Sequence, residues 1–151
     1  MDISTDAVKA LRDETGISVM ECKKALEEVG GDMDKARAVL RERAARSVEK
    51  KADRELGAGA VASYIHNAGQ VGALVLLSSE TDFVSKNEAF GALARDIAMH
   101  AAAMRPTSRE ELLEQPFIKD DTKTIGDLIA EATQKFGERI ELSELSVFSV
   151  K

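Results

Sequence analysis

Tryptophan is absent from this chain of 151 residues, and only one cysteine, one tyrosine and two prolines occur. Because Cys22 has no second cysteine to pair with, a disulfide or a zinc cage of cysteines within one chain is excluded, and a reducing compartment is expected. No apolar run reaches the ~18 residues of a membrane-spanning helix. The segment from Met1 to Asp6 lacks the basic and apolar regions of a signal peptide. We therefore expect a cytoplasmic, soluble protein that does not enter a membrane.

Positive charge is also in deficit, since 21 Lys and Arg stand against 27 Asp and Glu and the net charge is −6. Nucleic-acid binding needs concentrated positive charge. The one basic stretch, 41–54, has its cations interleaved with Glu42, Glu49 and Asp53 and contains no aromatic residue for base stacking. That pattern is typical of a solvated helical linker. The composition favours a protein that binds another protein, and RNA binding by this stretch is the weaker alternative.

Residues that could carry chemistry are few. His66 and His100 are the only histidines, and neither has a Cys, Asp or Glu at a metal-ligand spacing, so both are expected at the surface or its boundary. Glu80 and Asp82 have no other titratable partner nearby in sequence, and Cys22 is more typical of a core residue than of a redox centre. We expect no catalytic residue, no metal, no cofactor, no direct nucleotide binding and no enzymatic activity.

Residues 1–45 predict three short helices, separated by glycines at positions where helices commonly end. Ser18 and Glu21 fit a capping box, and Ile17 and Cys22 fit the hydrophobic staple that accompanies it. Three such helices resemble a ubiquitin-associated module. Residues 46–56 are interpreted as a basic helical linker.

Residues 57–151 predict an α+β core. A strand around 61–65 turns through 67–70 into an apolar strand that begins at Val71, which gives a β-hairpin. A long helix from Asn87 to Arg105, a short helix at 108–113, a loop from 116 to 122, a helix opened by a Thr124–Asp127 capping box and a last strand with a bulge at 143–144 complete the unit. We expect a three-stranded, mainly antiparallel sheet with helices on one face.

The apolar strand ends abruptly in Glu80-Thr81-Asp82-Phe83-Val84. Thr81 and Asp82 predict a point where the chain leaves the sheet and caps a new helix, since their side chains can accept the free N–H groups of a first turn. Phe83 then lies near the rim of the domain, where its ring is either an ordinary core residue or points at a partner. The local pattern alone favours the core.

Taken with its neighbours, this stretch resembles the signature of bacterial translation elongation factor Ts. Thr81-Asp82-Phe83-Val84 follows a Val-Gly-rich hairpin strand and precedes Asn87, Phe90 and an Ala-rich helix. The chain's start is similar to the N-terminal module of the same family, with the following segments in the same order: Leu11-Arg12, Thr15-Gly16, Cys22-Lys23-Lys24-Ala25-Leu26, Gly31-Asp32, Lys35-Ala36 and Leu40-Arg41.

The resemblance implies a guanine-nucleotide exchange factor that promotes GDP release from elongation factor Tu during protein synthesis. It implies that Phe83 is a wedge inserted into the partner's GTP-binding domain, with Asp82 as polar companion and Thr81 and Val84 as supporting positions. The helical module would contact the same domain through Leu11, Arg12, Thr15 and Gly16. Leu11 is equally a good core residue, and we favour that interpretation.

Two features depart from the family pattern. Ser78-Ser79 stands where an Asn-Cys pair often occurs, and the chain holds one strand-strand-helix-helix-strand unit where longer members resemble two. We therefore expect a homodimer, formed through the exposed sheet or its edge, that binds two partner molecules. The alternative function is a ubiquitin-associated-like protein-binding adaptor whose core dimerises and which has no exchange activity.

Overall fold

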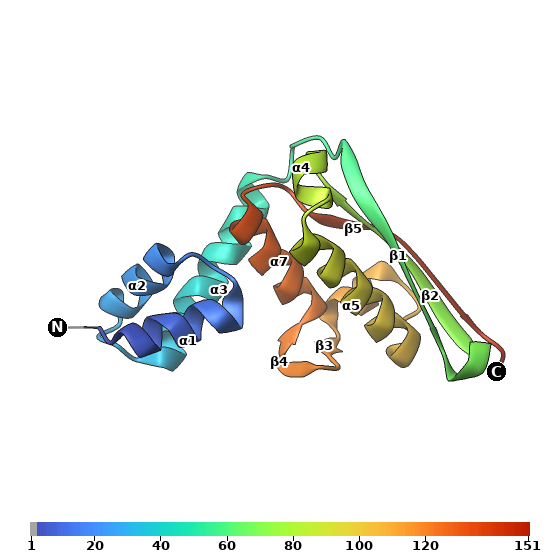
Figure 1. Ribbon diagram of the computed structural model, residues 1–151, viewed down its shortest axis with the longest axis horizontal. Coiled ribbons are helices and arrows are strands. Elements are labelled where there is room, and N and C mark those ends of the chain that lie inside the picture. Colours follow the sequence, from blue (N-terminus) through green and yellow to red (C-terminus); the bar gives the residue numbers. More distant parts are fainter. Residues whose placement is uncertain (1–2) are drawn as a thin grey trace.

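The computed structural model describes residues 3–151, which form an α+β protein (Figure 1). Met1 and Asp2 lie outside the described residues. The predictions that include them are the helical module of residues 1–45 and the lack of a signal peptide. The elements are α1 Thr5–Thr15, α2 Val19–Glu28, α3 Met33–Lys50, β1 Ala58–His66, a 3-10 turn Asn67–Gly69, β2 Val71–Ser79, α4 Asp82–Ser85, α5 Glu88–Met104, α6 Arg109–Glu114, β3 Pro116–Phe117, β4 Asp120–Thr124, α7 Ile125–Phe136 and β5 Glu141–Ser149. Within residues 3–151, no helix has both the length and the apolar character needed to cross a membrane.

Polar side chains open α2 and α3, and the Ser18 cap of α2 is predicted from the sequence. The Ser18 hydroxyl accepts a hydrogen bond from the backbone N–H of Glu21 at 3.2 Å, and the Asp32 carboxylate accepts one from that of Lys35 at 3.1 Å. The Glu21 side chain does not return a bond to Ser18 as the predicted capping box requires, because it pairs with Arg43 of α3 at 3.3 Å. Cys22 is fully buried in the small core of this module, which also contains the following residues: Val8, Leu11, Ile17, Ala25, Leu26, Ala36 and Leu40.

Helix α3 runs without interruption from Met33 to Lys50 and leads from α1 and α2 toward the sheet (Figure 1). The predicted boundary between module and linker at residue 45 therefore lies inside one helix. The division of the chain into residues 1–45, 46–56 and 57–151 stays a prediction.

The sheet has the predicted three strands, all antiparallel, in the order β1-β2-β5. Leu76 pairs with Glu144 and Leu77 pairs with Leu142, so Ser143 is the extra residue of a β-bulge at the predicted place. Side chains of a strand alternate between the two faces of a sheet. Ala73, Val75 and Leu77 of β2 are therefore buried on one face, and Leu74 is exposed on the other.

Helices cover only the inner face of the sheet (Figure 1). Helix α5 packs there through a stripe predicted from apolar residues that recur every three or four positions: Phe90, Leu93, Ala94, Ile97, Ala101 and Met104. Phe90, Ala94, Ile97 and Ala101 are fully buried as predicted, whereas Met104 is exposed. Phe136 of α7 lies edge-on to Phe90 at a centroid distance of 6.3 Å, which joins α7 to the same core. One layer of helices on one face of the sheet leaves the opposite face without cover.

Two predictions about this region are wrong. His100 is fully buried, because its ring lies between α5 and the segment that follows α6: one ring nitrogen is 2.9 Å from the Gln115 side-chain oxygen, and the other accepts the backbone N–H of Ile118 at 3.2 Å. The segment 116–122 is not a plain loop, since β3 and β4 form a small two-stranded sheet. The buried histidine fixes this small sheet against α5.

Candidate functional site

The chain leaves β2 at a corner formed by Glu80, Thr81 and the short helix α4, at one end of the sheet (Figure 1). The Phe83 side chain is 87 % exposed, whereas the next residue, Val84, is buried in the main core. Val84 thus anchors α4 while Phe83 points into solvent, which excludes the interpretation of Phe83 as an ordinary core residue. An exposed phenylalanine on an anchored turn is suited to insertion into a partner.

Thr81 precedes α4 as predicted, but its side chain does not cap the helix. Its hydroxyl donates to a carboxylate oxygen of Glu138 at 2.7 Å instead. Asp82 is the first residue of α4 and is exposed beside Phe83. The corner therefore presents one apolar ring and one carboxylate together.

Residues distant in sequence hold this corner. The other Glu138 oxygen accepts the backbone N–H groups of Glu80 and Thr81 at 3.1 and 3.0 Å. The Glu80 carboxylate in turn accepts the backbone N–H of Arg139 at 2.5 Å and the Arg54 guanidinium at 3.3 Å. Neither the partners of Glu80 nor the role of Glu138 follows from the local sequence, because Glu80 lies 26 residues from Arg54 and the contacts with Glu138 and Arg139 join positions more than 50 residues apart.

The second set of predicted contact residues lies at the end of α1. Leu11 is fully buried in the module, as favoured, and Thr15 is half-buried with its hydroxyl donating to the Leu11 carbonyl at 2.8 Å. Arg12 is exposed, and Gly16 ends the helix with φ 72°. Since α3 and α7 lie between α1 and α4, the structure does not bring the two predicted sets together (Figure 1).

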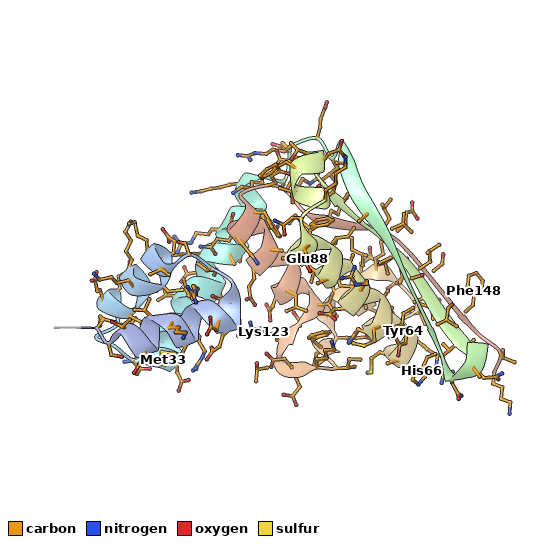
Figure 2. All side chains as sticks on the ribbon, viewed as in Figure 1. Met33, Tyr64, His66, Glu88, Lys123 and Phe148 are labelled. Atoms are coloured by element: carbon orange, nitrogen blue, oxygen red, sulfur yellow. The ribbon has the colours of Figure 1, made fainter. Side chains whose placement is uncertain are left out.

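The uncovered face of the sheet carries several exposed apolar side chains beside the polar Ser63, Glu144 and Ser146. Val61, Ile65, Leu74 and Phe148 are exposed there, and Figure 2 shows Phe148 on the side of the sheet away from the helices. A groove of about 420 Å³ runs along this face between Ile65, Leu74 and Phe148. Contiguous exposed apolar surface of this kind is typical of a protein-binding surface.

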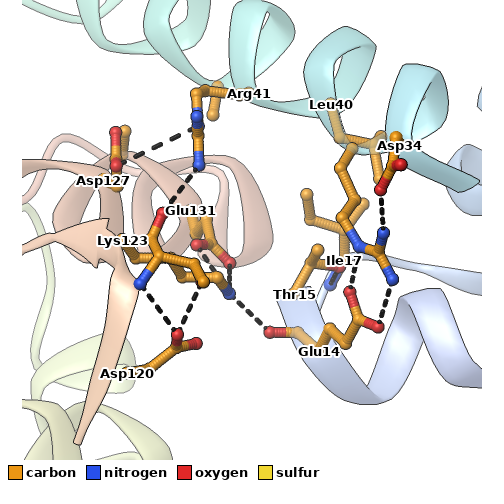
Figure 3. A pocket seen from close by; sticks show the side chains of 14 residues that line it. Glu14, Thr15, Ile17, Asp34, Leu40, Arg41, Asp120, Lys123, Asp127 and Glu131 are labelled. Carbon is orange, nitrogen blue, oxygen red and sulfur yellow. Dashed lines mark hydrogen bonds and ion pairs between the residues drawn. The ribbon is translucent and has the colours of Figure 1, made fainter.

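A larger cleft of about 470 Å³ lies between the helical module and the core (Figure 3). Lys123 crosses it, pairing with Glu131 of α7 at 3.0 Å and donating to the backbone carbonyl of Glu14 at 2.7 Å. Burial raises the pKa of the Glu131 carboxyl, and hydrogen bonding to Arg37 lowers that of Glu14. Since the charges that Figure 3 shows in the cleft bind one another, it is best described as the joint between the module and the core.

No group of three or more His, Cys, Asp or Glu side chains is placed to hold a metal ion in the part of the chain that the structure describes. Three exposed surfaces of the described chain are candidates for partner contact: the Phe83 corner, the end of α1 and the uncovered sheet face.

A family model described as Elongation factor TS matches residues 3–107 and 80–151 of the chain. The chain belongs to the elongation factor Ts family. It is 41 % identical to the elongation factor Ts of Desulforamulus reducens, over 93 % of this chain and 86 % of the relative. It is 37 % identical to that of Leptospira biflexa, over 99 % and 98 %, and 39 % identical to that of Thermosipho melanesiensis, over 98 % of each.

Relatives in this family carry additional internal sequence. The comparison with the Leptospira biflexa protein runs over 195 positions, 44 more than the 151 residues of this chain, although it covers nearly all of both proteins. The two stretches that match the elongation factor Ts model overlap at residues 80–107. The alignment shows that the Leptospira biflexa protein has internal sequence that this chain lacks.

Proposed function

We propose that the Phe83 corner is the part of the chain that drives nucleotide exchange. As a member of the elongation factor Ts family, the chain is a guanine-nucleotide exchange factor that promotes GDP release from elongation factor Tu in protein synthesis. Exchange breaks no covalent bond, so the chain is proposed to act as a binding protein, without a cofactor and without itself binding the nucleotide. Its place of action is proposed to be the cytoplasm.

The thermodynamics of exchange define what the site must do. An exchange factor binds the nucleotide-free partner more tightly than the GDP-bound partner, and by linkage GDP weakens binding of the factor to the same extent. A thousandfold acceleration of release requires roughly 4 kcal/mol of selective stabilisation along the release path. Burial of one phenylalanine side chain contributes about 1.5–3 kcal/mol. Phe83 can therefore supply the largest single contribution, and other contacts supply the remainder.

The exposure of Phe83 is the observation that carries this proposal. A ring that is 87 % exposed in the free chain has nearly all of its apolar area available for a partner. We propose that it inserts into the GTP-binding domain of elongation factor Tu and disturbs the site of the magnesium ion and phosphates. Asp82 is the polar companion, Thr81 fixes the approach of the chain, and the buried Val84 anchors the turn.

The end of α1 is proposed as a second, weaker contact with the same domain. Because the Leu11 side chain is buried, that contact would come from the exposed Arg12 and from the backbone at Thr15 and Gly16. Leu11 then supports the contact by shaping α1.

We also propose that two copies pair through the uncovered sheet face. Val61, Ile65, Leu74 and Phe148 are exposed on it, and the last three line a groove that a second copy can fill. A chain with less internal sequence than its relatives also has less of its own structure to cover this face. Sedimentation at micromolar concentration should detect a dimer, and a monomer there would contradict the proposal.

Release of a fluorescent GDP analogue from elongation factor Tu tests the function directly. Adding the purified chain with excess unlabelled GDP should accelerate loss of fluorescence, with saturation as the chain concentration rises. The adaptor alternative predicts no acceleration and no effect of Phe83→Ala. Acceleration that is lost in Phe83→Ala supports the proposed wedge.

A further inference from the structure

The Phe83 ring cannot set its own direction, because its side chain is exposed and α4 is only four residues long. Its orientation depends on what fixes the backbone on either side. On one side Val84 is buried in the core. On the other side, the buried Ser79 hydroxyl donates to the Thr81 carbonyl at 3.0 Å, but the backbone N–H groups of Glu80 and Thr81 lie beyond the end of β2 and need acceptors.

Glu138 supplies those acceptors. It directly follows Gly137, whose left-handed conformation at φ 72° ends α7 and turns the chain toward the corner. One Glu138 carboxylate oxygen accepts the backbone N–H groups of Glu80 and Thr81, and the other accepts the Thr81 hydroxyl at 2.7 Å. A single side chain thus engages three donors immediately before Asp82 and Phe83.

A second set of bonds holds Glu138 in turn. Glu80 accepts the backbone N–H of Arg139, and the Arg139 guanidinium donates to the backbone carbonyl of Arg54 at 2.7 Å. Arg54 donates to Glu80 at 3.3 Å and to the Gly137 carbonyl at 3.4 Å. These five residues, Arg54, Glu80, Thr81, Glu138 and Arg139, are here named the clasp. It joins three segments that are far apart in sequence at the base of α4.

The clasp uses Thr81 in a way that helix formation does not require. The hydroxyl of a threonine at the N-cap of a helix ordinarily accepts a hydrogen bond from a backbone N–H of the first turn. Here that hydroxyl donates to Glu138 instead, and no side chain caps α4. The first turn of α4 therefore lacks a side-chain cap, while three hydrogen bonds to Glu138 hold the two residues that precede it. This is expected if the orientation of Phe83 matters more than the stability of that turn.

We propose that Glu138 is a positioning residue for exchange: it holds the backbone of Glu80 and Thr81 so that Phe83 points outward in the orientation that enters the partner. This inference rests on the proposed function of Phe83. Without Glu138, the corner would still carry Phe83 and Asp82, but the ring would sample more directions and few of them would lead to productive insertion. Removal of the Glu138 side chain should therefore lower the maximal rate of exchange and change the half-saturating concentration of the chain much less.

Glu138→Ala in the full chain is the direct test, assayed with elongation factor Tu loaded with fluorescent GDP. We expect the maximal rate to fall at least fivefold while the half-saturating concentration changes less than twofold. Glu138→Gln should retain a larger part of the rate, because its amide oxygen can still accept both backbone N–H groups. Glu110→Ala is the matched control: this exposed glutamate of α6 makes no side-chain hydrogen bond or ion pair among residues 3–151, so wild-type rates are expected.

A double-mutant cycle separates positioning from a general structural role. In a Phe83→Ala background, Glu138→Ala should slow exchange less than twofold further, since there is no ring left to orient. Equal slowing in both backgrounds, or no slowing in the wild-type background, overturns the inference. If Phe83→Ala alone leaves exchange unchanged, the proposed function of Phe83 fails instead, so the two failures are distinguishable.

Discussion

Substitution of Phe83 by alanine should separate the function of the chain from its stability. The ring is 87 % exposed, so its removal takes away little buried apolar area from the folded chain. Exposed substitutions usually change the free energy of unfolding by less than about 0.5 kcal/mol. For a chain of this length, that corresponds to a shift in melting temperature of at most about 2 °C.

The effect on exchange should be much larger. Burial of a phenylalanine side chain against a partner contributes about 1.5–3 kcal/mol. If that contribution is made mainly along the release path, the maximal rate of GDP release falls about 10- to 150-fold. A loss confined to ground-state binding would instead raise the half-saturating concentration and leave the maximal rate unchanged.

Stopped-flow measurement of fluorescent GDP release, over a series of chain concentrations, gives both quantities. Met104→Ala is the control, because Met104 is another exposed apolar side chain and lies at the opposite end of α5 from α4. It should leave both quantities at their wild-type values. Wild-type exchange by Phe83→Ala, in a chain with an unchanged melting temperature, would refute the assignment of Phe83 as the wedge.

Further expectations concern the core, the module and the sheet face. Burial lowers the pKa of His100, and since the unfolded chain binds this proton near pH ~6.5, the free energy of unfolding should fall as the pH decreases below that value; urea titrations at about pH 7.5 and 5.5 should show a larger loss in the wild type than in His100→Gln. Burial raises the pKa of the Cys22 thiol, so its labelling by a disulfide reagent should require opening of the helical module and be at least about a hundredfold slower than in urea. Thr124→Ala removes a complete capping box from α7 and should cost about 0.5–2 kcal/mol in urea denaturation. Phe148→Asp puts a charge on the uncovered sheet face and should convert the proposed dimer to a monomer in sedimentation at micromolar concentration, whereas Phe83→Ala should remain dimeric.

Local sequence patterns predicted the elements whose causes are local. The capping box at Thr124 and the buried stripe of α5 each depend on residues within a few positions of one another. The bulge at Ser143 forms against β2, but the break in alternation that predicts it is local. The exposure of Phe83 was not predictable in this way, since the local pattern favoured a core residue. Only the resemblance of the whole Thr81 to Val84 stretch, with its neighbours, pointed to an exposed ring.

The missed features depend on contacts between distant segments. Nothing in the sequence of α5 around His100 marks it as buried. Its burial comes from contacts with Gln115 and Ile118, which follow α6 in the chain. The strand Asp120–Thr124 has no apolar alternation, so the strand pattern is absent from its sequence. The clasp residue Glu138 carried only one local sign, a position directly after the glycine that ends a helix, and that sign does not identify its partners.

The geometry of β2 relates the two surfaces proposed for binding. Gly72, near the start of β2, lies opposite Phe148 on the neighbouring strand, whereas Phe83 follows the far end of β2 beyond Ser79. At about 3.3 Å per residue, the strand places some 25 Å between the Phe148 end of the sheet face and the start of the corner. A second copy centred on the groove at Phe148 would therefore leave the Phe83 corner free, provided that the contact does not extend past Val61, which pairs with Leu76 closer to the corner. Strand β2 itself is fixed, because its inner side chains, including Val75 and Leu77, are buried in the core. The core therefore fixes the position at which the chain leaves the sheet, and the clasp orients the residues that follow, up to Phe83.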